Sequence, residues 1–299
     1  MARIEMRMGI DISGWQGLAI ADIDGDGLED IYVSQPGGLP NRLYRHRPNG
    51  TLEDVSAKAG VDWLDTTHGS LFADLDNDGD PDLIVGAADG IIVMENHGGV
   101  QFEVVATKIL PAGFAYSISA ADIDQDSDLD FFVCGYLPRA GVSRHHLFAH
   151  PVPYHDANNG GRNALFRNDG DWRFTDVTRA TGMDEKNTRF SYAATWEDYD
   201  LDGDLDLYVA NDFGRNSLYR NDFSQSGRVR FTDVADEAGV VDIAPGMSAC
   251  WGDYNNDGHA DLYVGNMFSS AGNRIAVQPE FLAEADAETR GEFLRHAGG

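Results

Sequence analysis

The chain has 299 residues, and its hydrophobic content of 42% is enough to bury a sizeable core. It carries 50 acidic against 22 basic side chains, which gives a formal net charge of −28. This excess of negative charge repels phosphate backbones and anionic lipid surfaces, so nucleic acids and membrane surfaces are disfavoured as partners and cations are favoured. No apolar run is long enough for a membrane span, and residues 1–9 lack the features of a signal peptide.

A nine-residue acidic pattern occurs five times, and successive copies are separated by steps of 52, 48, 76 and 55 residues. Three steps match the length of one four-stranded propeller blade, and the long step equals a blade plus an insert of about 25 residues. We therefore predict an all-β fold, a β-propeller of four-stranded antiparallel blades that forms a single domain over residues 1–299. The repeats cover approximately residues 10–62, 63–112, 113–184, 185–241 and 242–299.

In the first repeat, alternating apolar and polar residues predict strands over 17–21, 31–33, 41–45 and 52–55, with the acidic pattern between the first two. The third strand reads Asn-x-Leu-Tyr-Arg, and the fourth is related to Phe-Thr-Asp-Val in later repeats. Turns that contain glycine are expected after three of the fourth strands, at Gly60, Gly182 and Gly239.

The later repeats depart from this plan in two places. The third repeat holds an insert at about 137–162, between its second and third strands. In the fifth, a strand over 262–264 leads to a helical pattern over 279–295, with no third-strand sequence after it. We expect an incomplete last blade and a short C-terminal helix, so that the chain is either a fragment of a longer chain or an array that ends in a helical cap.

All five acidic patterns have oxygen-bearing side chains at positions 1, 3, 5 and 9. Together with a backbone carbonyl and water, they offer the roughly six to eight oxygen ligands that calcium takes. Carboxylates within about 4 Å repel by roughly 4 kcal/mol per pair at an effective dielectric near 20, so a cation is needed to neutralise them. We predict up to five Ca²⁺ ions, bound by Asp22, Asp24, Asp26, Asp30, Asp74, Asp76, Asp78, Asp82, Asp122, Asp124, Asp126, Asp130, Asp198, Asp200, Asp202, Asp206, Asp253, Asn255, Asp257 and Asp261.

Two loops depart from the pattern with aspartate at positions 1, 3, 5 and 9 and glycine at position 6. Position 6 is glycine in four loops, which permits a turn with positive φ, whereas Ser127 takes this place in the third repeat and is expected to strain it. In the fifth repeat the neutral Asn255 stands at position 3, so we expect weaker binding there. The five loops hold 23 acidic residues, and five calcium ions would reduce the net charge from −28 to −18.

Two other interpretations of the loops are less favoured. An EF-hand needs a glutamate at position 12 and flanking helices, but that position is valine inside an apolar strand in all five copies. The loops could also be solvated Asp-Gly turns, which are common singly. Five copies in register argue for metal binding.

The insert contains a histidine-rich stretch with His145, His146, His150 and His155. Imidazoles of this kind suit zinc or copper, but the surrounding prolines and glycines are typical of an irregular surface loop, which is favoured over a metal site. A long insert on one face of a repeat array is also a common place for partner binding. The candidate contacts for a partner are Arg144, Tyr154 and Trp172.

The cysteines and tryptophans fit a structural role. Cys134 and Cys250 fall two blades apart, too far for a disulfide, and both are expected to be buried. Trp15, Trp196 and Trp251 precede acidic loops on first strands, where they are expected to be blade-packing residues rather than ligand contacts.

From about residue 15 to 267, the repeats resemble the FG-GAP and VCBS repeats of the integrin α-chain propeller, whose calcium loops read Asp-x-Asp-x-Asp-Gly-x-x-Asp between two strands. The Asn-x-Leu-Tyr-Arg-Asn and Phe-Thr-Asp-Val segments are similar to those of the cartilage acidic protein and ASPIC/UnbV group of secreted repeat proteins. The resemblance implies a seven-bladed type of propeller, an extracellular or periplasmic location, and calcium in a structural role.

For function, we expect a non-catalytic adhesion, binding or scaffold module for a protein or glycan partner. The chain lacks a Gly-x-Ser-x-Gly elbow, a phosphate loop and a His-Glu-x-x-His motif. The alternative is a polysaccharide-active lyase or hydrolase on a calcium-stabilised propeller. Such an enzyme needs a cleft lined by acidic or basic groups that are not committed to the loops.

Overall fold

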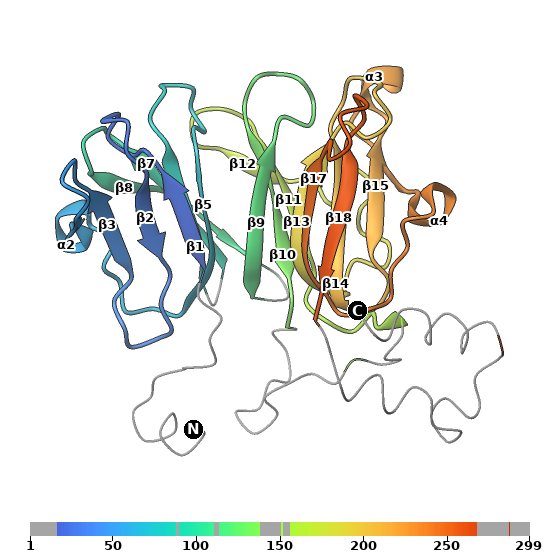
Figure 1. Ribbon diagram of the computed structural model, residues 1–299, viewed down its shortest axis with the longest axis horizontal. Coiled ribbons are helices and arrows are strands. Elements are labelled where there is room, and N and C mark those ends of the chain that lie inside the picture. The colour runs from blue at the N-terminus through green and yellow to red at the C-terminus, as the bar shows by residue number, and fades with distance from the viewer. Residues whose placement is uncertain are drawn as a thin grey trace, which may run out of the picture. The chain divides into compact units, whose positions relative to one another are not determined.

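The computed structural model describes residues 17–87, 90–110, 114–137, 151, 156–267 and 287 (Figure 1). The described strands form four four-stranded antiparallel sheets and one two-stranded sheet. Within each sheet, neighbouring strands follow one another in chain order, which is the arrangement of a propeller blade. The predicted fold class, an all-β chain built of four-stranded antiparallel propeller blades, is confirmed, and the fifth blade has two strands among the described residues.

The chain divides into two compact units, and the first comprises residues 1–133 and 164–177. In this unit the innermost strands β1, β5 and β9 lie beside one another in that order, running from blue to green in Figure 1. Its three blades consist of β1 (Leu18–Ala21), β2 (Asp30–Val33), β3 (Arg42–His46) and β4 (Leu52–Asp54); β5 (Thr67–Ala73), β6 (Asp82–Ala87), β7 (Gly90–Asn96) and β8 (Phe102–Ile109); and β9 (Ala115–Ala121), β10 (Asp130–Gly135), β11 (Ala164–Asn168) and β12 (Phe174–Asp176).

The second unit comprises residues 134–163 and 178–299. It contains the fourth blade, β13 (Phe190–Glu197), β14 (Asp206–Phe213), β15 (Ser217–Asn221) and β16 (Phe231–Asp233), and the two strands of the fifth, β17 (Gly246–Gly252) and β18 (Asp261–Asn266). Strands β13 and β17 lie beside each other. The predicted C-terminal helix over 279–295 falls outside the described residues, except for residue 287.

Three helices of one turn complete the described secondary structure: α2 (Ser56–Ala59), α3 (Phe223–Ser226) and α4 (Ala235–Ala238). Helices α2 and α4 follow fourth strands and end at Gly60 and Gly239, whose φ values of 75° and 71° are left-handed. This is the conformation that glycine adopts without strain, and it confirms the turns expected there. No helix in the described part of the chain is long and apolar enough to cross a membrane.

The asparagine of the third-strand motif closes the turn between the second and third strands. The Oδ1 atoms of Asn41, Asn163 and Asn216 accept hydrogen bonds of 2.7–2.8 Å from backbone N–H groups at the ends of the second strands. All three asparagines are buried. A buried amide that satisfies a backbone donor explains why the residue type recurs at this position.

The hydrophobic core lies between successive blades. In the first unit, one cluster joins residues of the first and second blades and another joins the second and third. In the second unit, a cluster joins the fourth blade to β17 and β18. Trp196 packs against Phe231 and Trp251 against Tyr208, in accordance with the expected packing role, whereas Trp15 is outside the described residues.

The two cysteines differ in their surroundings. Cys134 is buried as expected, but Cys250 is exposed, so the prediction for it is wrong. The physical reason is that Cys250 lies on β17, in the blade that has only two described strands and leaves one of its faces uncovered. Neither thiol forms a disulfide, in agreement with the prediction.

Candidate metal centre

Each acidic loop joins the first strand of a blade to the second. The first loop follows β1 directly at Asp22 and ends at Asp30, the first residue of β2. Antiparallel pairing of the two strands holds the ends of the loop close together, since Ala21 is the register partner of Asp30. The same strand–loop–strand arrangement occurs in the other four repeats.

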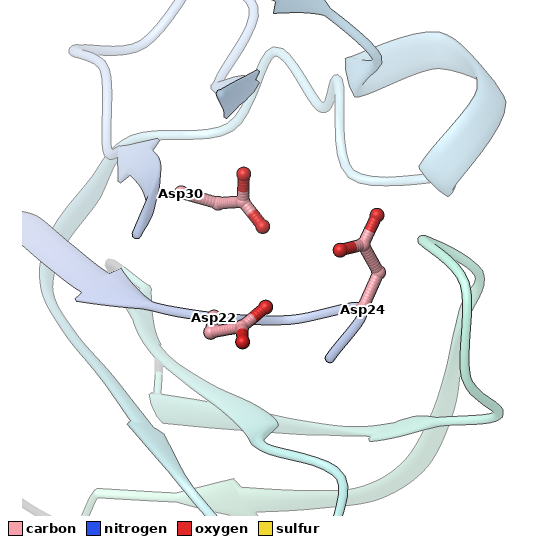
Figure 2. A group of neighbouring side chains, drawn as sticks. All are labelled: Asp22, Asp24 and Asp30. Atoms are coloured by element: carbon pink, nitrogen blue, oxygen red, sulfur yellow. The ribbon is translucent and has the colours of Figure 1, made fainter. Parts of the chain in front are cut away.

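In four loops the aspartates converge. Figure 2 shows the first, in which the carboxylates of Asp22, Asp24 and Asp30 point toward a common space. In each of the four groups, one carboxylate oxygen from each of three aspartates lies within 4.8 Å of the others. The groups are Asp22, Asp24 and Asp30; Asp74, Asp76 and Asp78; Asp122, Asp124 and Asp130; and Asp198, Asp200 and Asp206.

The aspartate at position 1 organises the loop around itself. Asp22 accepts hydrogen bonds from the backbone N–H groups of Asp26 and Gly27, with N–O distances of 3.0 and 2.8 Å. The N–H at position 6 donates to the first aspartate in all five loops, at 2.8–3.1 Å. These bonds fold the loop back on its first residue and thereby bring the carboxylates together.

Position 6 has a left-handed backbone in every loop. The four glycines there have φ between 85° and 97°, and Ser127 has φ of 77°. This backbone conformation confirms the strain expected at Ser127, because a side chain in the left-handed region costs about 1 kcal/mol or more. Position 4 is left-handed as well, and it includes Leu201 with φ of 59°.

The aspartate at position 9 has a second role that the sequence did not reveal. Asp130 is fully buried, and its two oxygens accept hydrogen bonds from the N–H of Ile123 at 2.9 Å and of Asn168 at 2.8 Å. The same pair of contacts, to loop position 2 and to the third strand, is made by Asp30, Asp82 and Asp206. These carboxylates therefore tie each loop to the third strand of its own blade.

Burial shifts the acidity of these carboxyl groups. Desolvation raises the pKa of Asp82, Asp130 and Asp206 to about 7, although backbone hydrogen bonds act in the opposite direction, and neighbouring aspartates raise it further. The pKa of Asp124 is raised by burial first and by the charges of Asp126 and Asp122 second. Groups that resist ionisation when alone become good ligands once a cation is present, because the cation stabilises the charged form.

The chemistry of the loops fits a hard cation. The Oδ1 atoms of Asp24, Asp74 and Asp124 are buried but have no hydrogen-bond partner among the described residues. A buried carboxylate oxygen without a partner is costly, and a metal ion that accepts oxygen ligands would satisfy it. Asp24, Asp74 and Asp124 each belong to one of the convergent groups, so the uncompensated oxygens lie where the cation would bind.

The arginine of the third-strand motif forms ion pairs with the loop carboxylates in one blade but not in two others. Arg45 forms ion pairs with Asp24 and with Asp26, the latter at 3.1 Å. Its counterparts Arg167 and Arg220 pair instead with Asp169 at 2.6 Å and Asp222 at 3.0 Å, both outside the loops. A guanidinium therefore compensates part of the negative charge of the first loop directly.

The fifth loop differs from the others. Its three aspartates do not form a convergent three-carboxylate group, although Asp257 N–H donates to Asn255 Oδ1 at 2.9 Å. Weaker metal binding in this repeat therefore stays a prediction.

The histidine-rich stretch cannot be placed, because residues 138–150 and 152–155 fall outside the described residues. This range includes the candidate contacts Arg144 and Tyr154. Trp172 is partly buried and packs against the core cluster of the second and third blades.

The repeats identify the family. A family model described as FG-GAP-like repeat matches residues 22–85, 74–133 and 198–264, which together make up more than half of the chain. This chain belongs to the FG-GAP-like repeat family.

Among curated proteins, the chain is similar to cartilage acidic protein 1. It is 25% identical to the Homo sapiens protein over 288 residues, which cover 87% of this chain and 40% of the relative. It is 27% identical to the Mus musculus protein over 290 residues, with the same coverage. The chain thus spans about two fifths of the length of the curated relatives that it matches.

Solved structures show weaker similarity. A structure of an Agrocybe aegerita lectin that recognises non-reducing terminal N-acetylglucosamine has a TM-score of 0.48 and 18% identity, and the match covers 84% of this chain and 60% of that one. An exotype rhamnogalacturonan lyase, YesX, has a TM-score of 0.40 and 12% identity, with 81% and 48% covered. At these scores, neither similarity carries an argument about function.

Proposed function

We propose that this protein is a calcium-binding β-propeller module that serves as an extracellular or periplasmic binding or scaffold element and has no catalytic role. The observation that carries the proposal is the convergence of three carboxylates within 4.8 Å in each of four loops. At this separation, two charges repel by roughly 3 kcal/mol at an effective dielectric of about 20. Four such groups in one molecule favour a bound cation at each.

Calcium fits the loops better than magnesium does. Each loop combines several carboxylates with a wrapped backbone, which suits the flexible geometry of roughly six to eight ligands around calcium. Magnesium demands near-ideal octahedral geometry and tends to keep its water. The residues that would hold the ion are those of the convergent groups. The further donors are Asp26, Asp126 and Asp202 at position 5 of their loops and Asp82 at position 9 of the second loop.

The partner is proposed to be a protein or a glycan that binds through the loops. The net charge of −28 disfavours nucleic acid and anionic membranes. The resemblance to secreted repeat proteins supports a location in which free calcium is abundant. The remainder of a longer protein is a second proposed partner, because the chain matches only part of the length of its curated relatives.

An enzymatic role has less support. A glycosidase needs two carboxyl groups at a defined separation in a cleft. Among the described residues, Asp212 is the one aspartate outside the loops whose pKa is raised, and it is buried and accepts a hydrogen bond from Tyr136. A single buried carboxyl of this kind does not make such a pair, so we propose the binding module.

The test has two parts, each with magnesium as the control cation. Calcium is titrated into the full chain and its binding is measured by calorimetry, and the melting temperature is measured with and without calcium. We expect about four strong sites, and a rise in melting temperature with calcium that magnesium does not reproduce. Saturation at about 100 times Kd stabilises the folded state by about 2.7 kcal/mol per site. Absence of a calcium-specific rise would refute the metal-binding part of the proposal, and turnover of a polysaccharide would refute the non-catalytic part.

A further inference from the structure

One position of the third strand carries a charged side chain beside the acidic loop. It precedes the residue whose backbone N–H donates to the position-9 aspartate, so these hydrogen bonds fix its place in all four four-stranded blades. We name it the third-strand charge position, and its occupants are Arg45, Glu95, Arg167 and Arg220. Because a calcium ion carries two positive charges, the sign and direction of this side chain affect how strongly the loop attracts the ion.

In the third and fourth blades, an aspartate outside the loop holds the arginine. Arg167 Nη2 lies 2.6 Å from Asp169 Oδ1, and Arg167 Nε donates to the same oxygen at 2.8 Å. Arg220 is held by Asp222 in the same way, and both distances are 3.0 Å. Each aspartate stands two residues after its arginine. Because two contacts bind each guanidinium to this aspartate, neither arginine forms an ion pair with a loop carboxylate among the described residues.

In the first blade, Arg47 stands at the place of that aspartate, so Arg45 has no carboxylate two residues further along its own strand. Arg47 itself forms an ion pair with Glu53. The guanidinium of Arg45 reaches the loop instead, where its Nη2 forms ion pairs with Asp24 and, at 3.1 Å, with Asp26. An arginine in place of an aspartate therefore accounts for the different direction of the guanidinium in this blade.

The carboxylates that Arg45 contacts are those that a metal ion would use. Asp24 belongs to the convergent group of the first loop, and Asp26 is its further donor at position 5. In both side chains the Oδ2 atom is paired with the guanidinium. The Asp24 side chain is 5% exposed and that of Arg45 is 27% exposed, so water screens this pair less than a pair on the open surface. The guanidinium and a calcium ion therefore compete for the same carboxylates.

The other loops act as internal controls. The convergent groups of the first, third and fourth loops occupy the same positions, 1, 3 and 9, and each of these loops holds five acidic residues. What distinguishes the first loop is the guanidinium bound to its carboxylates. The second loop is equally acidic, but its third-strand charge position is the negative Glu95, whose Oε1 lies 3.4 Å from Nδ1 of His97. The four sites therefore differ in the charge beside them although their loops hold the same number of acidic residues.

We propose that Arg45 is a built-in cation that competes with calcium for the first loop and makes this loop the weakest calcium site among the four convergent groups. The inference rests on the calcium binding proposed above and adds the order in which the loops fill. Calcium binds first to the second loop, where Glu95 adds negative charge, then to the third and fourth loops. It binds last to the first loop, because there the guanidinium must leave the carboxylates. The first loop thus responds to a higher range of calcium concentration than the other three.

The first test is calorimetric titration of calcium into the full chain and its variants. Arg45→Gln removes the positive charge at nearly constant length and is expected to raise the lowest of the four affinities about tenfold. Adding Asp24→Asn to Arg45→Gln is expected to abolish this gain, which assigns the gain to the first loop. Arg220→Gln is the matched control, because Arg220 is bound to Asp222 outside its loop, and it is expected to change every affinity less than about twofold.

The second test compares melting temperatures in excess chelator and in saturating calcium. In chelator, Arg45→Gln is expected to melt below the wild type, because Asp24 and Asp26 lose their counterion. In calcium, the variant is expected to melt at or above the wild-type temperature, because the ion supplies the missing positive charge. A purely structural role of Arg45 would give the same deficit in both conditions. Circular dichroism verifies that each variant is folded before the comparison.

The outcomes separate this inference from the proposed function. The inference is overturned if Arg45→Gln binds calcium no more tightly than the wild type, or if its melting deficit is as large in calcium as in chelator. In both of these cases the wild type still binds calcium, so the proposed function stands. If neither the wild type nor Arg45→Gln binds calcium, the metal-binding part of the proposed function is refuted and this inference falls with it.

Discussion

The position-9 aspartate offers the sharpest test of the loop architecture. We predict that Asp130→Ala lowers the free energy of unfolding even when calcium is absent. The carboxylate is fully buried and accepts hydrogen bonds from the N–H groups of Ile123 and Asn168. Each buried donor left without a partner costs about 1–3 kcal/mol, so the expected loss is about 2–6 kcal/mol. Because burial raises the pKa of Asp130 to about 7, the loss is expected in full at about pH 5.5, where the carboxyl is mostly uncharged, and is smaller above about pH 7, where the substitution also removes a buried charge.

The position-3 aspartate of the same loop is the matched comparison. Asp124 lies in the convergent group, and its buried Oδ1 has no hydrogen-bond partner among the described residues. Asp124→Asn removes one charge at nearly constant shape, so the calcium-free protein is expected to be unchanged or slightly more stable, because like-charge repulsion falls. The gain in stability on addition of calcium is expected to shrink.

The assay is urea unfolding with excess chelator and with saturating calcium, followed by tryptophan fluorescence. Trp172 packs against the core of the second and third blades and reports on this region. The reasoning is refuted if Asp130→Ala leaves the chelated protein as stable as the wild type. It is also refuted if Asp124→Asn loses as much stability in chelator as Asp130→Ala does.

Two further predictions concern backbone strain and pH. Ser127→Gly should raise the free energy of unfolding in urea by about 1 kcal/mol, because φ is 77° at this position. The opposite type of change at the same position of the fourth loop, Gly203→Ser, should lower it, and variants as stable as the wild type would contradict the strain argument. Without calcium, Asp82, Asp130 and Asp206 have folded-state pKa values of about 7, which lie above the pKa of an unfolded aspartate. The protonated forms of these three side chains therefore contribute fully to the free energy of unfolding below about pH 4, and this contribution is lost as the pH rises through about 7. The melting-temperature gain from calcium should therefore be larger at about pH 7.5 than at about pH 5.5, and a gain independent of pH would contradict the assignment.

Much of the fold could be predicted from the sequence because its signals are local. Alternation of apolar and polar residues predicted the third strand over 41–45, and β3 covers Arg42–His46. The aspartate and glycine spacing predicted loops between first and second strands, and the departure at Ser127 predicted the strained turn. These signals involve residues within a few positions of one another, so they can be recognised in the sequence without knowledge of the tertiary structure.

The double role of the position-9 aspartates could not be predicted in this way. The spacing of the aspartates predicted only that Asp130 is a metal ligand, like the other aspartates of its loop. Its bond to Asn168 depends on how the third strand is registered against the second, across 38 residues that include the insert. Cys250 was misjudged for a related reason, because burial on β17 depends on whether another blade covers that face.

The repeat, the blade strands, the acidic loops and the positions that need glycine can all be predicted from the amino-acid sequence, because each depends on short-range periodicity and backbone sterics. Which carboxylates converge, which of them also accept hydrogen bonds from backbone N–H groups, and which apolar residues are exposed are known only from the folded chain. Those features depend on strand register and on contacts between blades, such as that between Tyr208 and Trp251. The same residue type is therefore sealed at Tyr208 and exposed at Tyr263, because only the first is followed by another blade in the described structure.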